Sequence, residues 1–280
     1  MTYTTSDTTI TILVENTAAD RGMISEHGLA YWIQRGETRI LFDTGAGTAL
    51  FHNAAALNID LNTTSAIAIS HGHYDHTGGL IRLLEILKQP VPVYLHPDAL
   101  QSKYSGSGGH AHPAGMTENE LEAIKSMKHR LVFTECVTEI ASGIYLTGKV
   151  PRITDYEDTG GPFFLDAGLT QPDPLDDDQS LYFDTDQGTV VLLGCAHAGV
   201  INTLKHIQHH TAGRNIHTCC GGMHLESAGE YRLAQTIIAL KNMNIRKLGP
   251  MHCTGIAATV RLWTDLPGRC IDCHTGSILR

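Results

Sequence analysis

One short segment of this 280-residue chain concentrates metal-binding side chains. Residues 70–80 read Ser-His-Gly-His-Tyr-Asp-His-Thr-Gly-Gly-Leu, so His71, His73, Asp75 and His76 fall within six positions, directly after an apolar stretch. Imidazole nitrogens and carboxylate oxygens together suit zinc and other divalent first-row metals. In an extended segment His71 and His73 point the same way, and a turn after them carries Asp75 and His76 to the other side of a small pocket. We predict a metal site here rather than a solvated histidine-rich loop.

Three further histidines each end an apolar stretch: His197 in residues 194–202, His224 in residues 221–225 and His252 in residues 250–255. Asp43 ends another, in the segment Ile-Leu-Phe-Asp-Thr-Gly. Together with the cluster at 71–76, these motifs resemble the metallo-β-lactamase superfamily over about residues 9–260. Within it they are similar to the branch named after dihydropterin ribofuranosylaminobenzene-phosphate synthases.

The resemblance implies an α/β fold (α+β in some schemes) of four layers, an αββα sandwich with metals held in loops at one edge of the paired sheets. It implies that His71 and His73 bind a first metal. Asp75 and His76 then bind a second metal, which His252 completes. Asp75 is also expected to orient the attacking water or to act as its general base.

The family pattern breaks at His197, where many members of the superfamily have an aspartate that bridges two metals. A neutral imidazole cannot bridge two ions through two oxygens as a carboxylate can. Either His197 serves one metal, or Asp177 or Asp178 supplies the missing oxygen. We therefore expect Zn²⁺ as one or two ions, with two slightly favoured, while the ligand types are also compatible with iron or manganese.

Other polar residues have both a functional and a structural interpretation. His224 either binds the metal or contacts the substrate, or else it is a hydrogen-bonded group of the core. Asp43 is expected to orient an imidazole by accepting its second N–H. Arg152 could grip a phosphate or carboxylate with two parallel hydrogen bonds, or form a surface ion pair. His110 and His112 could cover the site, although the polarity of an exposed loop explains them better.

The composition narrows the class of protein. There are 20 basic and 29 acidic side chains, a net charge of −9, and 42% of the residues are hydrophobic. These values indicate a globular core and disfavour a broad nucleic-acid surface, which needs clustered Lys and Arg. No apolar run approaches the roughly 20 residues that span a bilayer. Residues 1–7 show no secretory pattern, so we expect a cytoplasmic protein whose seven cysteines are mostly buried free thiols.

The hydrophobic pattern alternates between strand and helix. Strands are predicted at 9–14, 28–34, 38–42, 65–70, 91–95, 180–183, 189–193, 216–220 and 247–251. Helices are predicted at 48–57, 80–88, 118–128, 200–209, 228–241 and 256–263. Residues 101–119 are rich in Ser, Gly and His, which predicts a loop or lid. Residues 162–179 are predicted to form a second long loop. Because no linker separates the halves, we predict a single domain over 1–280 with the lid inserted at about 101–119.

Three functions follow as hypotheses. The first is a hydrolase that uses a metal-activated water on a phosphorylated or phosphodiester small molecule. Pterin derivatives are among the candidate substrates. The second is a pterin-related synthase that forms a bond at the same metal site. The third is a metal-bound ligand sensor without catalysis. A mononuclear iron oxygenase is also compatible with the ligands. We expect an anionic small-molecule substrate and neither a nucleic-acid nor a membrane partner. Whether the protein forms a homo-oligomer is left open.

Two other chemistries are disfavoured. Cys270-Ile-Asp-Cys273-His274 matches the pattern of covalent haem attachment. Without an export signal or an evident axial ligand, a spare thiol pair is the better interpretation. Ser70 lacks the turn of a nucleophile elbow, and the chain has no phosphate-binding Gly-x-x-x-x-Gly-Lys segment.

Overall fold

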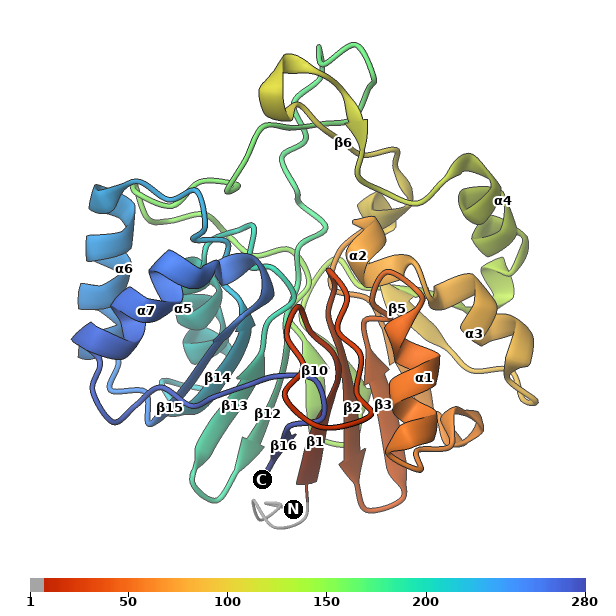
Figure 1. The fold of residues 1–280 in the computed structure, drawn as a ribbon, viewed down its shortest axis with the longest axis horizontal. Helices are drawn as coiled ribbons and strands as arrows, with labels where there is room; N and C mark the ends of the chain where they lie inside the picture. The colour runs from red at the N-terminus through yellow and green to blue at the C-terminus, as the bar shows by residue number, and fades with distance from the viewer. Residues whose placement is uncertain (1–7) are drawn as a thin grey trace.

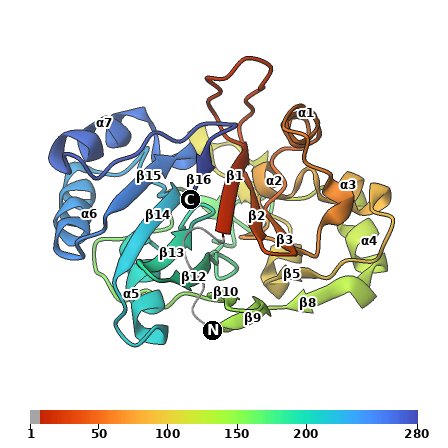
Figure 2. The same ribbon diagram turned by 90° about the horizontal axis from the view of Figure 1, so that it is seen from below.

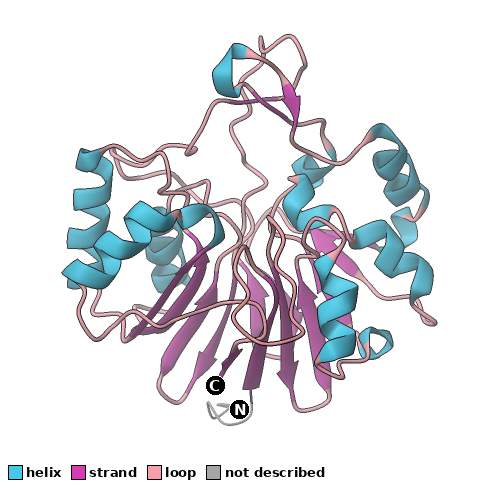
Figure 3. Ribbon diagram, viewed as in Figure 1, coloured by secondary structure: helices cyan, strands magenta, loops and turns pink. Residues whose placement is uncertain are grey.

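Two β-sheets face each other in the centre of the molecule, and helices cover the outer face of each (Figures 1 and 2). The computed structural model describes residues 8–280, so the N-terminal segment used above to predict localisation lies outside the described residues. The αββα sandwich predicted from the sequence is confirmed by this arrangement (Figure 3). Within residues 8–280, no helix is both long enough and apolar enough to span a lipid bilayer.

The first sheet has seven strands in the order β16-β1-β2-β3-β4-β5-β8. Their bounds are β16 Ile278–Leu279, β1 Thr8–Val14, β2 Ala30–Arg35, β3 Thr38–Phe42, β4 Ala66–Ala68, β5 Val93–Leu95 and β8 Leu131–Phe133. Strands β1 to β3 are antiparallel, while β3, β4, β5 and β8 run parallel. The carboxyl ends of β3 and β4 therefore lie at the same edge of the sheet.

The second sheet has six strands in the order β15-β14-β13-β12-β10-β9. Their bounds are β15 Lys247–Met251, β14 Ile216–Gly222, β13 Gly188–Leu192, β12 Leu181–Thr185, β10 Ile144–Leu146 and β9 Thr138–Ala141. Strands β13, β14 and β15 are parallel, so their carboxyl ends also meet at one edge.

Seven α-helices are formed in residues 8–280: α1 Ala49–Ala56, α2 Tyr74–Thr77, α3 Leu80–Ile86, α4 Glu118–Ser126, α5 Val200–His210, α6 Glu230–Asn242 and α7 Ile256–Asp265. Short 3₁₀ turns occur at Leu61–Thr63, Pro97–Leu100, Ser107–Gly109, Lys128–Arg130 and His252–Thr254. Helix α4 begins with a capping box, in which Thr117 and Glu120 satisfy each other's backbone N–H groups.

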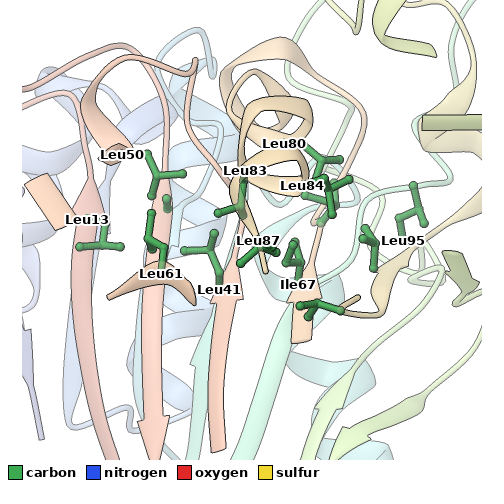
Figure 4. Close-up of a cluster of buried hydrophobic side chains, with 14 of the residues drawn as sticks. Leu13, Leu41, Leu50, Leu61, Ile67, Leu80, Leu83, Leu84, Leu87 and Leu95 are labelled. Carbon is green, nitrogen blue, oxygen red and sulfur yellow. The ribbon is translucent and has the colours of Figure 1, made fainter. Parts of the chain in front are cut away.

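Three layers of apolar side chains separate the four layers of backbone. Leucines of α1 and α3, such as Leu50 and Leu83, pack on Leu41 and Ile67 of the first sheet (Figure 4). A second cluster fills the space between the two sheets, and a third lies between the second sheet and helices α5, α6 and α7. Burial of these faces is the main force that holds the strand ends in register.

The elements predicted from hydrophobic periodicity are confirmed, with shifts of a few residues at their ends. Outside the two predicted loops, the sequence analysis missed four short strands, β8, β9, β10 and β16, because each is only two to four residues long and shows little alternation. The predicted turn after His73 is the one-turn helix α2. In the Cys270–His274 segment, Cys273 packs with Cys220 in the cluster between the sheets.

The two predicted loops meet above the open edge of the sandwich. Residues from the first loop form β6 (Tyr104–Ser105) and β7 (His112–Pro113), and the second loop adds β11 (Phe163–Phe164). These strands form a small three-stranded sheet in the order β11-β6-β7, which stands at the top of Figure 1. We call this three-stranded sheet the lid.

Candidate metal centre

The candidate ligands sit in loops that follow parallel strands of both sheets. Asp43 follows β3, and the segment 71–76 follows β4. In the second sheet His197 comes after β13, His224 after β14 and His252 after β15. Because the carboxyl ends of parallel strands gather at one edge, side chains up to about 180 positions apart in the chain meet there.

His71, His73 and His197 form the first donor group. Nε2 of His71 lies 2.9 Å from Nδ1 of His73. The ring centre of His197 lies 4.8 Å from that of His71 and 5.0 Å from that of His73. One nitrogen from each of the three rings lies within 4.8 Å of the other two. Two atoms bound to one ion at about 2.0–2.3 Å cannot be further apart than about 4.6 Å, so the group is close to the size that one ion requires.

Asp75, His76 and His252 form the second donor group. Oδ2 of Asp75 lies 3.2 Å from Nε2 of His252 and 3.8 Å from Nε2 of His76. The two imidazole nitrogens are 3.3 Å apart. His27, which the sequence analysis missed, lies at the rim of this group, with Nε2 3.2 Å from the same carboxylate oxygen.

The ring orientations in both groups are set by hydrogen bonds on the far side of each imidazole. Nδ1 of His76 donates to Asp43 at 2.7 Å, Nδ1 of His252 lies 2.8 Å from the side-chain oxygen of Asn16, and Nδ1 of His197 donates to the carbonyl of Thr159 at 2.8 Å. A histidine that donates through Nδ1 has its lone pair on Nε2. The Nε2 atoms therefore face the interior of the site as acceptors.

This arrangement fits a divalent cation better than it fits a network of hydrogen bonds. Nε2 of His73, Nε2 of His197 and Nδ1 of His224 are buried without a hydrogen-bond partner among the described residues. Orphaned buried polar atoms of this kind are costly. Nitrogens bound to one tetrahedral ion at about 2.05 Å would be about 3.3 Å apart, close to the separations of 2.9 and 3.3 Å found here.

Burial and neighbouring charge set the protonation of the site. Burial lowers the pKa of His71 and His197 well below its usual range and that of His73 to about 3, so these imidazoles are neutral at pH 7. Burial alone would raise the pKa of Asp75, but the charge of His76 and the hydrogen bonds from His252 and His27 outweigh it and hold that pKa well below normal. Burial would lower the pKa of His76, but the carboxylates of Asp43 and Asp75 raise it. The first donor group thus offers neutral nitrogens and Asp75 an ionised carboxylate, which are the forms that bind metal, while His76 must release its proton to bind.

Four residues at the same edge have a strained backbone. Asp43, Ala196, His224 and His252 have positive φ angles of 63°, 52°, 46° and 51°. Residues with a Cβ rarely adopt this conformation, at a cost of about 1–3 kcal/mol each, and it persists where the surrounding structure imposes it. Here it turns the chain sharply after a strand, at three site residues themselves and at Ala196, which directly precedes His197.

The two donor groups lie at the floor of a cavity of about 590 Å³. His73, Asp75 and His252 line it from below, while His112 and Phe163 of the lid line it from above. The ring of Phe163 lies 4.9 Å from that of His73 and 5.1 Å from that of His197. His112 thus reaches the cavity, whereas His110 is not among the described residues that line it.

Arg152 is not placed where we expected it. Its guanidinium donates to the backbone carbonyls of His197 and Pro174, at 2.6 and 2.7 Å, and it does not line the cavity. We correct its expected substrate contact to a structural one, because one guanidinium nitrogen holds the His197 loop and the other holds the loop at Pro174. Glu157, from the same segment, caps the first turn of α5 by accepting from the N–H groups of Ile201 and Asn202.

Neither Asp177 nor Asp178 joins a group of metal-binding atoms in residues 8–280. Asp177 accepts from the backbone N–H of Gly72 at 2.8 Å and from Lys103 at 3.0 Å. Asp178 accepts from the N–H of Ala198 at 2.8 Å, and burial raises its pKa to about 6. Of the two alternatives left open by the sequence, the described contacts place His197, and neither aspartate, in a group of metal-binding atoms, while Oδ1 of Asp178 is buried without a hydrogen-bond partner among the described residues.

His224 and two cysteines complete the surroundings of the first donor group. The ring of His224 lies 4.2 Å from that of His197. The sequence analysis treated Cys195 and Cys253 as ordinary buried thiols, but both line the cavity and belong to groups of atoms that could hold a metal. The available signal was the position of each, two residues before His197 and one after His252.

Known proteins share both the sequence pattern and the fold. The profile of the metallo-beta-lactamase superfamily matches residues 25–218. A 7,8-dihydropterin-6-methyl-4-(beta-D-ribofuranosyl)-aminobenzene-5'-phosphate synthase from Methanocaldococcus jannaschii is 26% identical over 265 residues, which span 91% of this chain and 90% of that protein. An uncharacterized protein of the same archaeon is 30% identical over 253 residues, 90% of this chain and 93% of its own.

Among solved structures, a protein described as a metal-dependent hydrolase of the beta-lactamase superfamily superposes with a TM-score of 0.80 and 30% identity over 98% of each chain. The Zn(2+)-bound PqqB from Methylobacterium extorquens superposes with a TM-score of 0.56 over 97% of this chain and 99% of its own, but at 13% identity it supports the fold alone. The histidine, aspartate and cysteine groups described above lie at the edge of this shared metal-binding fold. The chain belongs to the metallo-beta-lactamase superfamily.

Proposed function

We propose that this protein is a metal-dependent hydrolase that acts on a phosphorylated or phosphodiester small molecule. The observation that carries the proposal is the convergence of two donor groups, from three separate loops, on the floor of one cavity. The solved relative with 30% identity, described as a metal-dependent hydrolase, supports the same reaction class. We propose zinc as the metal, held by His71, His73 and His197 on one side and by Asp75, His76 and His252 on the other.

A bound divalent cation would supply Lewis acidity and make water acidic enough to react at neutral pH. Asp75 lines the cavity and is ionised, so its carboxylate can orient a water and accept its proton. His27 lies 3.2 Å from Oδ2 of Asp75, and its side chain is 59% exposed. It therefore offers a path for that proton from the buried carboxylate to solvent.

The cavity lining bears on the substrate. Among the described residues that line it, none is Lys or Arg, and Asp75 and Glu226 are acidic. Attraction for an anionic group must therefore come from the metal and the imidazoles rather than from a basic clamp. Phe163 provides an apolar face beside the metal centre, which suits a substrate with a ring or another flat apolar part.

A second function is a bond-forming reaction of pterin chemistry at the same site. The observation that favours it is the 26% identity, over nine-tenths of both chains, to the M. jannaschii synthase. A sensor that binds a ligand without turnover is the remaining alternative.

One set of assays separates these functions. The purified protein, loaded with zinc, iron or manganese in turn, is tested on phosphomonoesters and phosphodiesters. It is tested separately on dihydropterin diphosphate with an aminobenzene-ribosyl-phosphate. Metal-dependent release of phosphate or alcohol supports the hydrolase, and a new pterin product supports the synthase. Ligand-induced melting shifts without any turnover would instead identify a sensor and refute the proposed hydrolysis.

A further inference from the structure

Cys195 lies where the two donor groups meet. Its side chain is buried, and its Sγ lies 3.2 Å from Nε2 of His76. The same sulfur lies within 4.8 Å of donor atoms on His71, on His197 and on His252. Those histidines belong to different donor groups. Cys195 therefore reaches both halves of the centre.

A second observation points to a ligand at this place. His197 is buried and uses Nδ1 for the carbonyl of Thr159, yet its Nε2 has no hydrogen-bond partner in the described chain. This nitrogen forms one compact group with His71 and His73, and another with Cys195 and His224. A buried lone pair left free between these two groups is the arrangement expected when a cation completes it.

We propose that the Cys195 thiolate is a metal ligand shared by the two donor groups, in place of a bridging carboxylate. The inference rests on the metal binding put forward under the proposed function. Ions in two-metal sites stand about 3.5–4 Å apart, and sulfur binds zinc at about 2.3 Å, so one sulfur between two such ions can reach both. Among the described residues, Cys195 is the one whose donor atom occurs in three of the potential metal-binding groups.

Among the described residues, no carboxylate belongs to a group of metal-binding atoms that contains Cys195. Both oxygens of Asp177 are engaged, one with Lys103 and the other with the N–H of Gly72. Asp178 accepts from the N–H of Ala198 with Oδ2, and its Oδ1 is buried without a hydrogen-bond partner among the described residues. Neither aspartate occurs in a group of metal-binding atoms. In the described chain, the sulfur of Cys195, and no carboxylate oxygen, groups with donor atoms of both halves of the centre.

Cys253 is the nearest alternative thiol, but its position is peripheral. Its Sγ donates to the backbone carbonyl of Cys195 over 3.7 Å. It occurs in one potential metal-binding group only, together with Cys195 and His252. No potential metal-binding group contains Cys253 together with His71 or His197. Cys253 therefore does not connect the two donor groups.

The coordination step needs no oxidant. The thiol S–H bond breaks, its proton goes to solvent, and the sulfur electron pair forms the bond to the cation. The metal keeps its oxidation state. A thiolate is a soft ligand and favours zinc, cobalt or iron(II) over magnesium and manganese. The proposal therefore predicts that manganese and magnesium bind more weakly than zinc and cobalt.

Cobalt substitution tests the sulfur ligand directly. Metal-free wild-type protein is titrated with Co²⁺ under argon while bound cobalt is counted and the near-ultraviolet spectrum is recorded. We expect a thiolate-to-cobalt charge-transfer band that saturates at about two ions per chain. Cys195→Ser should lose the band and at least one ion. Cys219→Ser, which changes a buried thiol of β14 outside all of the groups, should keep both.

A further variant guards against a loss caused by misfolding. Cys195→Asp restores a carboxylate and should recover the ion count without the band, with a circular dichroism spectrum like that of the wild type. A band that persists in Cys195→Ser, or that disappears in Cys253→Ser instead, would overturn the assignment. Two ions bound by the wild type without any band would leave the metal-dependent function standing and refute Cys195 alone. Absence of metal binding in every protein would refute both.

Discussion

Oδ2 of Asp43 accepts a hydrogen bond from Nδ1 of His76 at 2.7 Å and another from the hydroxyl of Ser70 at 2.7 Å. Its other oxygen accepts from the backbone N–H of Ser70 at 2.7 Å. The carboxylate is fully buried at the end of β3 and thereby ties that strand to the metal-binding segment after β4. The same contact fixes the tautomer of His76, so its Nε2 faces Asp75 and His252.

Replacing Asp43 by Ala should weaken metal binding by about 10–100-fold, because the imidazole of His76 loses the group that orients it. The affinity is measured by competition with a coloured chelator. The matched control is Glu37→Gln, a change of a carboxylate that is 99% exposed, which should leave the affinity unchanged. An unaltered affinity in Asp43→Ala would show that packing alone orients His76.

Replacing His73 by Ala should abolish both the bound metal and the turnover, since it removes a nitrogen 2.9 Å from His71 in the first donor group. Metal content is measured by elemental analysis and activity with the substrate found in the assays above. His209→Ala, at an exposed position of α5, serves as the control. Full activity in His73→Ala would refute the proposed site.

Removing the metal should lower the melting temperature, because a ligand that binds only the folded chain stabilises it. At a metal concentration 100 times the dissociation constant the stabilisation is about 2.7 kcal/mol. Melting is followed by circular dichroism before and after dialysis against a chelator, and again after zinc is returned. A melting temperature that does not respond to chelator or zinc contradicts a site built from these donors.

Lys103 is buried and pairs with Asp173 at 2.8 Å and with Asp177 at 3.0 Å. Lys103→Met should lower the free energy of unfolding by about 3–5 kcal/mol, because it leaves buried carboxylates unpaired. Lys149→Met is the matched control. Its ion pair with Asp176 is partly exposed and should contribute less than about 1 kcal/mol. Urea denaturation of the two variants measures the difference, and equal losses would contradict this explanation.

Phe163→Ala should raise KM for a substrate with an apolar part and leave the metal content unchanged, since the ring lines the cavity without offering a donor atom. Steady-state kinetics and elemental analysis provide the two readouts. Phe133→Ala, which removes a ring that is 52% exposed on β8, is the control. A loss of metal in Phe163→Ala would show that the lid holds the donor groups in place rather than the substrate.

The sequence by itself determined the fold class, most of the strands and helices, and the compact cluster from His71 to His76. These depend on local patterns, namely the alternation of apolar residues and the spacing of donors within one turn. It also showed which histidines end strands, which is why His197, His224 and His252 could be named before any contact was known. The expected contact of Asp43 with an imidazole is present as well.

Only the tertiary structure decided which of these side chains meet. Cys195 and His76 are 119 positions apart, yet their side chains lie 3.2 Å apart. That contact depends on how two sheets pack, which no local pattern encodes. The same packing turned Arg152 toward backbone carbonyls, left Asp178 outside the donor groups and brought His27 to the rim. The sequence gives the type of each side chain. Which side chain it contacts depends on the burial of apolar surfaces that lie far from it along the chain.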